Sequence, residues 1–419
     1  MAGFGTFRNS YLYLRDADFS SKALDRFDKE QHNFFGHAEI TLASFVQMSE
    51  KWAFGLINRS RNMATLKRIP RELAKFGYEG LDHPPLHNQR FEHSNFHAKG
   101  MAWGEIGIYA GRIIHQFGEQ FVYAGASVKI LNGFGYAGIN FDNIDCVADS
   151  LNLDVNNFEG DFAFAVPGWG KGYGAGMDLG LTIVKTLQAA GHHIPHSIKG
   201  NCKSVDYLYK IGFSLLDVGI IRFYNSSTLR GVENEFLTWD GYSNQAVIGL
   251  SSFDFIATQK LEKSGADFYS DSTFNAWLPV SMSFQGDYNF ENGFFASGVL
   301  MAPINLGQRH GAQRIFSAHA SLRYEHRLFE VGVPLSAYMI RRPSIGLWLR
   351  LGVLEIGSGN FLPFLFNQSV YSGDVYAGLK FNILQSKECR QYRRSQKHLI
   401  HGVQIFRFRR IKPTSQQAK

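Results

Sequence analysis

The strongest constraint on the fold is a strict alternation of apolar residues with polar or small residues near the C-terminal end of the chain. It occurs in residues 328–339, 347–356 and 371–383; in the first of these, every second position from Phe329 to Leu335 is apolar. A period of two places the two classes on opposite faces of a β-strand. Strands of about ten residues are typical of membrane barrels, whereas strands of soluble proteins usually have about five to six. The pattern predicts an all-β protein, an antiparallel transmembrane outer-membrane β-barrel.

The composition agrees with such a barrel. Aromatic residues make up 15% of the 419 residues and charged residues 19%, below the roughly 25% charged residues of an average soluble protein. No apolar run approaches the roughly 18 residues that a membrane helix requires. A chain of this kind crosses a membrane only as a closed barrel, because lipid does not tolerate open sheet edges.

The net charge of +7 comes from the C-terminal end. Residues 386–419 hold ten Lys and Arg and one Glu, so the remainder carries 33 basic and 35 acidic residues. This balance argues against a nucleic-acid partner. We expect three parts: an N-terminal segment at 1–35, a barrel at 36–384 and a basic tail at 385–419. The first part shows no signal peptide, so for an outer-membrane protein we expect it to be truncated.

Most of the barrel region divides into candidate strands and turns. About fourteen strands are expected, including separate strands at 90–99, 101–114, 119–131 and 136–148. A short internal helix is expected at 69–77, with Pro70 near its first position and Gly77 at its end. A second partly helical stretch is expected near 257–264.

Several segments together resemble a known protein family. They are residues 52–58, 71–77, 176–181, 211–223, 273–280 and 373–383. In order and spacing they are similar to outer-membrane β-barrels of unknown function from Bacteroidota, which are distantly similar to the long-chain fatty-acid transporter barrels. The resemblance covers roughly residues 36–384. It implies a barrel in the outer membrane and, by analogy, transport through a plugged lumen.

No motif identifies an enzyme, a cofactor or a metal site. His192, His193 and His196 lie in a Pro-containing loop without a carboxylate nearby, so a solvated loop is favoured over zinc. The glycine-rich residues 167–176 lack the order of a phosphate loop and are expected to form a turn. Ser321 with His319 or His326 makes no triad. Cys146, Cys202 and Cys389 give no disulfide framework, and free thiols are expected.

Two aspartates have related surroundings and are the main candidates for a site in the lumen. Asp178 in MDLGL and Asp217 in LLDVGI both fall opposite the apolar face of their strands. They either contact a ligand or plug, or form internal salt bridges, and the salt-bridge interpretation is favoured. The candidate basic partners are Lys185, Lys210, Arg222 and Arg350, and the last three join the aspartates as lumen candidates.

The sequence leaves three functions open. The first is passive transport of a hydrophobic small molecule, with the helix residues Arg71, Glu72, Leu73 and Phe76 as candidate plug. The second is a non-transporting barrel scaffold that anchors a periplasmic or secretion-related complex. The third is a soluble all-β binding protein. The expected partners are outer-membrane lipid and either a hydrophobic ligand or a periplasmic protein.

Overall fold

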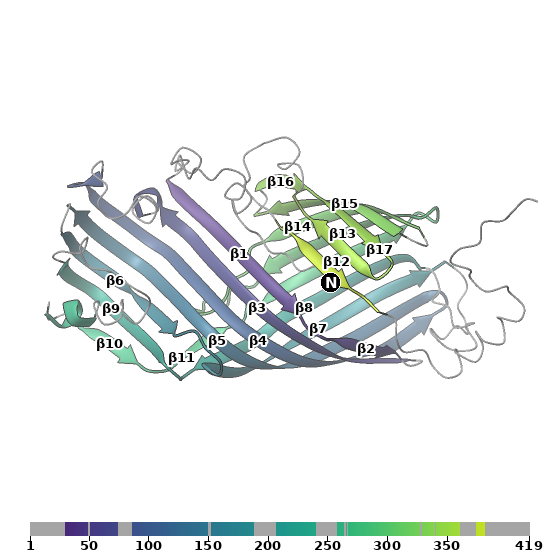
Figure 1. Ribbon diagram of the computed structural model, residues 1–419, viewed down its shortest axis with the longest axis horizontal. Helices are drawn as coiled ribbons and strands as arrows, with labels where there is room; N and C mark the ends of the chain where they lie inside the picture. The colour runs from purple at the N-terminus through teal and green to yellow at the C-terminus, as the bar shows by residue number, and fades with distance from the viewer. Residues whose placement is uncertain are drawn as a thin grey trace, which may run out of the picture.

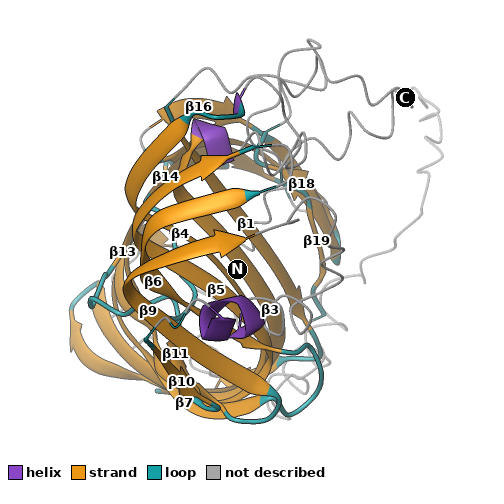
Figure 2. Cartoon of the chain, turned by 90° about the vertical axis from the view of Figure 1, so that its left-hand side faces the viewer, coloured by secondary structure: helices purple, strands orange, loops and turns teal. Residues whose placement is uncertain are grey.

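The strands form one antiparallel sheet. The computed structural model describes residues 30–48, 51–73, 86–149, 152–187, 207–239, 258–263, 265, 267–326, 329–339, 341–360 and 374–381. These residues contain nineteen strands in a single sheet. The expected all-β, antiparallel, barrel-like fold is confirmed, and the strands curve around a common interior, called the lumen below (Figures 1 and 2).

Many consecutive strands pair as antiparallel hairpins, although some pairings join strands that are not consecutive. The first nine are β1 (Gln31–Thr41), β2 (Phe45–Met48), β3 (Trp52–Pro70), β4 (Arg90–Phe117), β5 (Gln120–Ala148), β6 (Leu153–Ala165), β7 (Gly172–Thr186), β8 (Tyr207–Phe223) and β9 (Ser227–Trp239). The remaining ten are β10 (Phe268–Asp271), β11 (Phe274–Trp277), β12 (Ser281–Asn289), β13 (Phe294–Pro303), β14 (Ser317–Glu325), β15 (Phe329–Tyr338), β16 (Arg341–Ile345), β17 (Leu347–Leu351), β18 (Leu354–Ser358) and β19 (Tyr376–Leu379).

Some neighbouring segments share one pairing partner. β1 and β2 both pair with β3, and β11 and β12 both pair with β8. Divided strands of this kind raise the number of segments, and nineteen occur where about fourteen strands were expected.

The strands β3, β4 and β5 are longer than expected. β4 has 28 residues and β5 has 29, and each joins two stretches that were expected as separate strands. They run obliquely across the whole molecule (Figure 1). The period of two in β3 continues through Arg61, Met63 and Thr65, which are buried. The expected helix at 69–77 is therefore wrong at its start, because Ile69 and Pro70 still belong to β3.

Only short helical pieces occur in the described residues, at 71–73 and 258–263. The second piece confirms the helical stretch expected near 257–264. Within the described residues, no helix has the length and apolar character needed to cross a membrane.

Apolar side chains on the outer face of the sheet form a band, the outer belt. Ile108 and Val128 are cross-strand partners and are each 66% exposed. On β7 the exposed positions run from Tyr173 to Ile183. Strand rise and a tilt near 40° make that stretch about 25 Å tall, which matches the roughly 25 Å apolar band of membrane barrels. Other members are Trp52, Phe54, Ile106, Ile130, Met177, Leu179, Leu181, Ile211, Phe213, Met282, Phe284, Leu300, Leu322, Val333, Leu335, Leu347, Leu351, Ile356 and Leu379.

The long strands continue past the outer belt and form an extension of the sheet. β5 pairs with β7 up to Gly133 and then with β6 from Tyr136 onward. On β3 the outward positions change from Trp52 and Phe54, which are apolar, to Asn62, which is polar and exposed. The inner face of the extension is packed by a separate apolar cluster of Leu86, Phe91, Phe96, Ile144, Cys146, Ala148 and Val155.

Candidate functional site in the lumen

Eight charged side chains meet inside the barrel and form a contiguous group, the central cluster. Its acidic members are Glu39, Glu105, Asp178 and Asp217, and its basic members are Arg59, Arg61, Lys129 and Arg314. Arg61, Glu105, Lys129 and Asp217 have 2% or less of their surface exposed. Four negative and four positive charges make the cluster neutral, as buried charges require.

The strand register brings these side chains together. Arg59 and Arg61 occupy alternate positions of β3 and so share its inner face. Arg59 is the cross-strand partner of Glu105 on β4, and Ser127 of β5 is the partner of Asp178 on β7. Arg61 also lies over the ring of Trp103, 4.9 Å from its centroid. The inner faces of five neighbouring strands, β3, β4, β5, β7 and β8, thus meet at one level.

Asp217 is the centre of the cluster. Its Oδ1 and Oδ2 accept hydrogen bonds from the two terminal nitrogens of Arg61 at 2.9 and 3.1 Å. The same carboxylate accepts from Lys129 Nζ at 2.9 Å and from Arg314 at 2.7 Å. Three cations therefore share one buried carboxylate, which makes each pairing depend on the others.

The backbone at Asp217 is unusual for a strand. Its φ is +59°, a left-handed conformation that costs energy for a residue other than glycine. The pairing of β7 with β8 shifts register here, between Met177 and Leu179. The amide of Asp217 donates to Asp178 Oδ1 at 2.8 Å, which satisfies the N–H that this irregularity turns away from the ladder.

A non-strand stretch enters the lumen between β13 and β14. This inner segment comprises residues 304–316 and carries Arg314 to the central cluster. Thr65 of β3 donates to the backbone oxygen of Gln313 at 3.1 Å, and the side chains of His97 and Gln313 are 3.1 Å apart. The amide of Gly311 donates to the hydroxyl of Tyr136 on β5 at 3.2 Å. The inner segment therefore reaches strands that precede it by more than 150 residues.

A second set of polar contacts holds the middle of the inner segment. Arg309 bridges Asp161 of β6 and Asp142 of β5. The side-chain amide of Asn140 donates to the backbone oxygen of Arg309 at 3.2 Å. His310 Nε2 is 3.4 Å from Asp161 Oδ1. Burial is the largest influence on the pKa of His310 and lowers it below the ordinary value, so the imidazole is neutral at pH 7.

Large side chains fill the space around these contacts. Trp103, Leu131, Ile221, Phe223 and Leu278 are at most 1% exposed. Together with the central cluster and the inner segment, they occupy the middle of the lumen. Every carboxylate of the central cluster faces a base, so the cluster offers no unpaired acid for proton transfer. Its charges compensate one another within the cluster.

A second charged group lies closer to the turn at residues 290–293 than the central cluster does. Tyr207 and Arg323 donate to Asp287 at 2.8 and 2.9 Å, and Arg323 also donates to Glu325 at 2.8 Å. Arg350 forms an ion pair with Glu330. Lys210 lies over the ring of Tyr207, 3.5 Å from its centroid, and on β8 it is the partner of Asp287.

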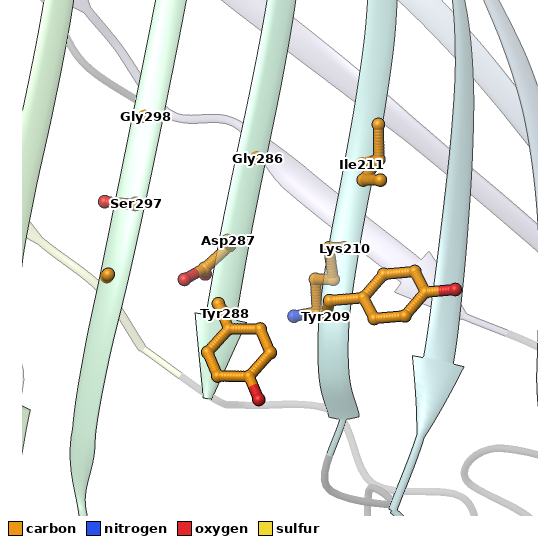
Figure 3. Close-up of a pocket in the computed structure, with 9 residues that line it drawn as sticks. Tyr209, Lys210, Ile211, Gly286, Asp287, Tyr288, Ser297 and Gly298 are labelled. Atoms are coloured by element: carbon orange, nitrogen blue, oxygen red, sulfur yellow. The ribbon is translucent and has the colours of Figure 1, made fainter. Parts of the chain in front are cut away.

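A hollow of about 430 Å³ lies in the wall beside this group. Its lining includes Lys210 and Asp287, together with Tyr209, Ile211, Gly286, Tyr288, Ala296, Ser297 and Gly298 (Figure 3). A Cβ at Gly286 would meet no atom within 4 Å, because this position faces outward into open space.

The structure separates the residues that the sequence proposed for the lumen. Asp178 and Asp217 lie together in the central cluster, whereas Lys210 and Arg350 lie near or in the second group. Arg222 is exposed and lies on the face of β8 opposite the buried Ile221 and Phe223. The aspartates do form internal salt bridges, but with Arg61, Lys129 and Arg314 instead of the basic residues expected.

The expected plug helix lies elsewhere. Arg71, Glu72 and Leu73 form a helical turn at the end of β3, where Leu73 packs against the apolar cluster of the extension. Phe76 lies outside the described residues, as do His192, His193, His196, Cys202 and Cys389. Cys146 is a buried free cysteine. Among the described residues, no three His, Cys, Asp or Glu side chains group as metal ligands would.

Sequence reasoning missed the inner segment and six of the eight cluster members, namely Glu39, Glu105 and all four bases. Arg59 and Arg61 carried a usable signal, since both fall on the strand face opposite Trp52 and Phe54. The inner segment has no such periodic signal, because its position depends on contacts with distant strands.

Comparisons with known proteins place the chain in a family. No curated protein matches it. Among solved structures, it is similar to the ferric yersiniabactin uptake receptor FyuA from Yersinia pestis, with 7% sequence identity and a TM-score of 0.25. The match covers 83% of this chain and 43% of that one, so the chain spans less than half of the receptor's length. Residues 6–358 match a family of unknown function, DUF5723, and the chain therefore belongs to that family.

Proposed function

We propose that this protein is an outer-membrane β-barrel. The outer belt supports this proposal, because it exposes large apolar side chains on many neighbouring strands at one level. Exposed apolar surface of this extent in a protein usually meets a partner or a lipid phase. The height of the belt fits the apolar part of a bilayer. Closure of the sheet, the outer-membrane location, a Bacteroidota source and the likeness to fatty-acid transporters all remain predictions.

The role that the geometry supports best is that of a sealed barrel that anchors another structure. The single observation that carries this proposal is the filled centre of the lumen. A transporter of a hydrophobic solute needs an apolar path, but here a solute would meet eight charged groups and the inner segment. The extension of the sheet, which rises past the outer belt, provides a surface for a periplasmic or secreted protein partner.

Passive transport of a hydrophobic molecule would require a large rearrangement. The inner segment would have to leave the lumen, and buried ion pairs would have to separate in a medium where each costs several kcal/mol to break. A soluble binding protein is disfavoured for a different reason, since its outer belt would face water. Outer-membrane lipid is the partner that this proposal requires, and no surface of the described residues calls for a nucleic acid.

Cell fractionation combined with heat-modifiable gel mobility tests the location and the fold. The chain would be expressed behind a signal peptide and recovered from the outer membrane. We expect a faster band without boiling than after boiling, because a folded barrel resists detergent. Recovery in the soluble fraction without a mobility shift would contradict the proposal.

Transport in proteoliposomes tests the role. A sealed anchor releases no trapped dye and does not accelerate the entry of a fluorescent long-chain fatty acid above the rate of empty liposomes. Faster fatty-acid entry that depends on correctly folded protein would support the transport hypothesis instead.

A further inference from the structure

The inner segment is longer than its place in the sheet requires. Met301 on β13 and Ser317 on β14 are paired neighbours, so the two strands already form a hairpin. Loops of about two to five residues join such strands. The additional residues at 304–316 instead cross the lumen, which indicates a task inside the barrel.

Arg314 brings a charge from the inner segment to a carboxylate that belongs to the barrel wall. Its guanidinium lies 2.7 Å from Asp217 Oδ2, and its side chain is 15% exposed. Every other member of the central cluster comes from β1, β3, β4, β5, β7 or β8. Arg314 is thus the one member of the cluster that does not belong to the wall.

The charge balance of the central cluster depends on Arg314. With Arg314 in place, four carboxylates face four bases. Without it, three bases remain, and the wall alone carries one net negative charge at its centre. Asp217 would then keep its bonds with Arg61 and Lys129 but lose the bond that its Oδ2 accepts from Arg314.

We propose that the barrel wall contains a cation site centred on Asp217, which the guanidinium of Arg314 occupies as an internal ligand. The inner segment is the seal of the lumen, and Arg314 is its charged contact. The ligand class is a planar monovalent cation of the guanidinium type, because Asp217 Oδ2 receives a guanidinium in this structure. A lumen freed of the inner segment passes cations in preference to anions. The permeation part of this inference rests on the proposed membrane barrel, whereas the cation site does not.

Chemical rescue tests the site without any permeability measurement. Arg314→Ala removes the guanidinium and leaves Asp217 with two bases. We expect the temperature at which the folded band disappears to be lower in this variant than in the wild type. Low-millimolar guanidinium chloride should reverse most of that decrease. The same concentration of tetramethylammonium chloride should have no such effect, because that cation donates no hydrogen bonds.

The matched control is the double variant Arg314→Ala with Asp217→Asn. It lacks the carboxylate, so guanidinium should no longer raise its transition temperature. Equal rescue of the single and the double variant would overturn the site, as would the absence of rescue in the single variant.

A shortened connection tests the seal. In this variant Asn-Gly replaces residues 304–315, and the hairpin pairing of β13 and β14 is preserved. In planar bilayers we expect the wild type to be silent and the shortened barrel to conduct, with a reversal potential in a KCl gradient that shows cation preference. Adding Asp217→Asn to it should reduce that preference.

The outcomes separate the seal from the barrel itself. A shortened barrel that still shows the gel shift but stays silent, or prefers anions, would overturn the seal while the membrane barrel stands. A wild type found in the soluble fraction would refute the membrane barrel. If the shortened variant fails to fold, the rescue of Arg314→Ala still decides whether the cation site exists.

Discussion

Arg61 and Asp217 are joined by two hydrogen bonds, at 2.9 and 3.1 Å, although 156 residues separate them in the chain. The pair links β3 to β8 across the inner face of the barrel. Lys129 of the intervening strand β5 bonds to the same carboxylate at 2.9 Å. Charges from several strands thus neutralise one another inside the barrel, and the proposed seal of the lumen depends on this arrangement.

Replacement of Asp217 by Asn tests how much this arrangement contributes to stability. Asn tolerates the left-handed backbone and keeps the shape, so mainly the charge is lost. Three buried cations then lose their shared counter-ion, and we expect a loss of about 3–5 kcal/mol in the free energy of unfolding. Urea titration of the detergent-solubilised protein measures it. Glu291→Gln, in an exposed turn, serves as control and should change the midpoint little.

Close packing beside the cluster predicts a cost at Gly219. A Cβ there would lie 2.5 Å from the oxygen of Ala175 and 2.7 Å from Cα of Gly176, both backbone atoms. Because backbone cannot give way as a flexible side chain can, Gly219→Ala should destabilise by about 1–3 kcal/mol. Gly286→Ala is the control, since nothing lies within 4 Å of its added Cβ. Similar losses at both positions would contradict the packing described here.

A lysine in the outer belt distinguishes lipid from water around the barrel. Val128 is 66% exposed, so Val128→Lys would be harmless in a soluble protein. Near the middle of a bilayer the charge should cost about 2–4 kcal/mol and reduce folding into liposomes. Asn62→Lys, on the outer face of the extension, should fold as well as the wild type. A Val128→Lys protein that folds and inserts normally would refute the lipid-facing belt.

Acidification should weaken the contacts that keep the inner segment inside the lumen. Burial lowers the pKa of His310, so the unfolded chain binds a proton here more readily than the folded one. The contribution of His310 to stability is therefore complete above its unfolded pKa of about 6.5 and is lost as the pH falls below it. Between about pH 7.5 and pH 5, the gel-shift temperature of the wild type should fall more than that of His310→Gln. A larger fall in the gel-shift temperature of His310→Gln than of the wild type would contradict this role of His310.

The sequence predicted those parts of the fold that local alternation determines. The apolar residues from Phe329 to Leu335 follow a period of two, and β15 forms there. It failed at β3, where Pro70 was taken as the start of a helix, although pairing of Gln31 with Pro70 and of His32 with Ile69 keeps the strand extended. Pairing with a distant strand overrides a local helix signal in this way.

The candidate site was predicted in part. Asp178 and Asp217 were recognised because both fall on the face opposite the apolar residues of their strands. Their partners could not be deduced, because strand order and register decide which base lies opposite each acid. The position of Arg314 was harder still to predict, because it depends on a segment that leaves the sheet and crosses the lumen.

The most direct test of the account is the accessibility of spin labels on the outer belt. Single cysteines at Val128 and at Asn62 would be labelled after replacement of the three native cysteines, and the protein would be folded into lipid vesicles. We predict that the label at 128 collides mainly with oxygen, which concentrates in lipid, and that the label at 62 collides mainly with a water-soluble nickel complex. Equal access of the nickel complex to both positions would contradict a membrane-spanning barrel.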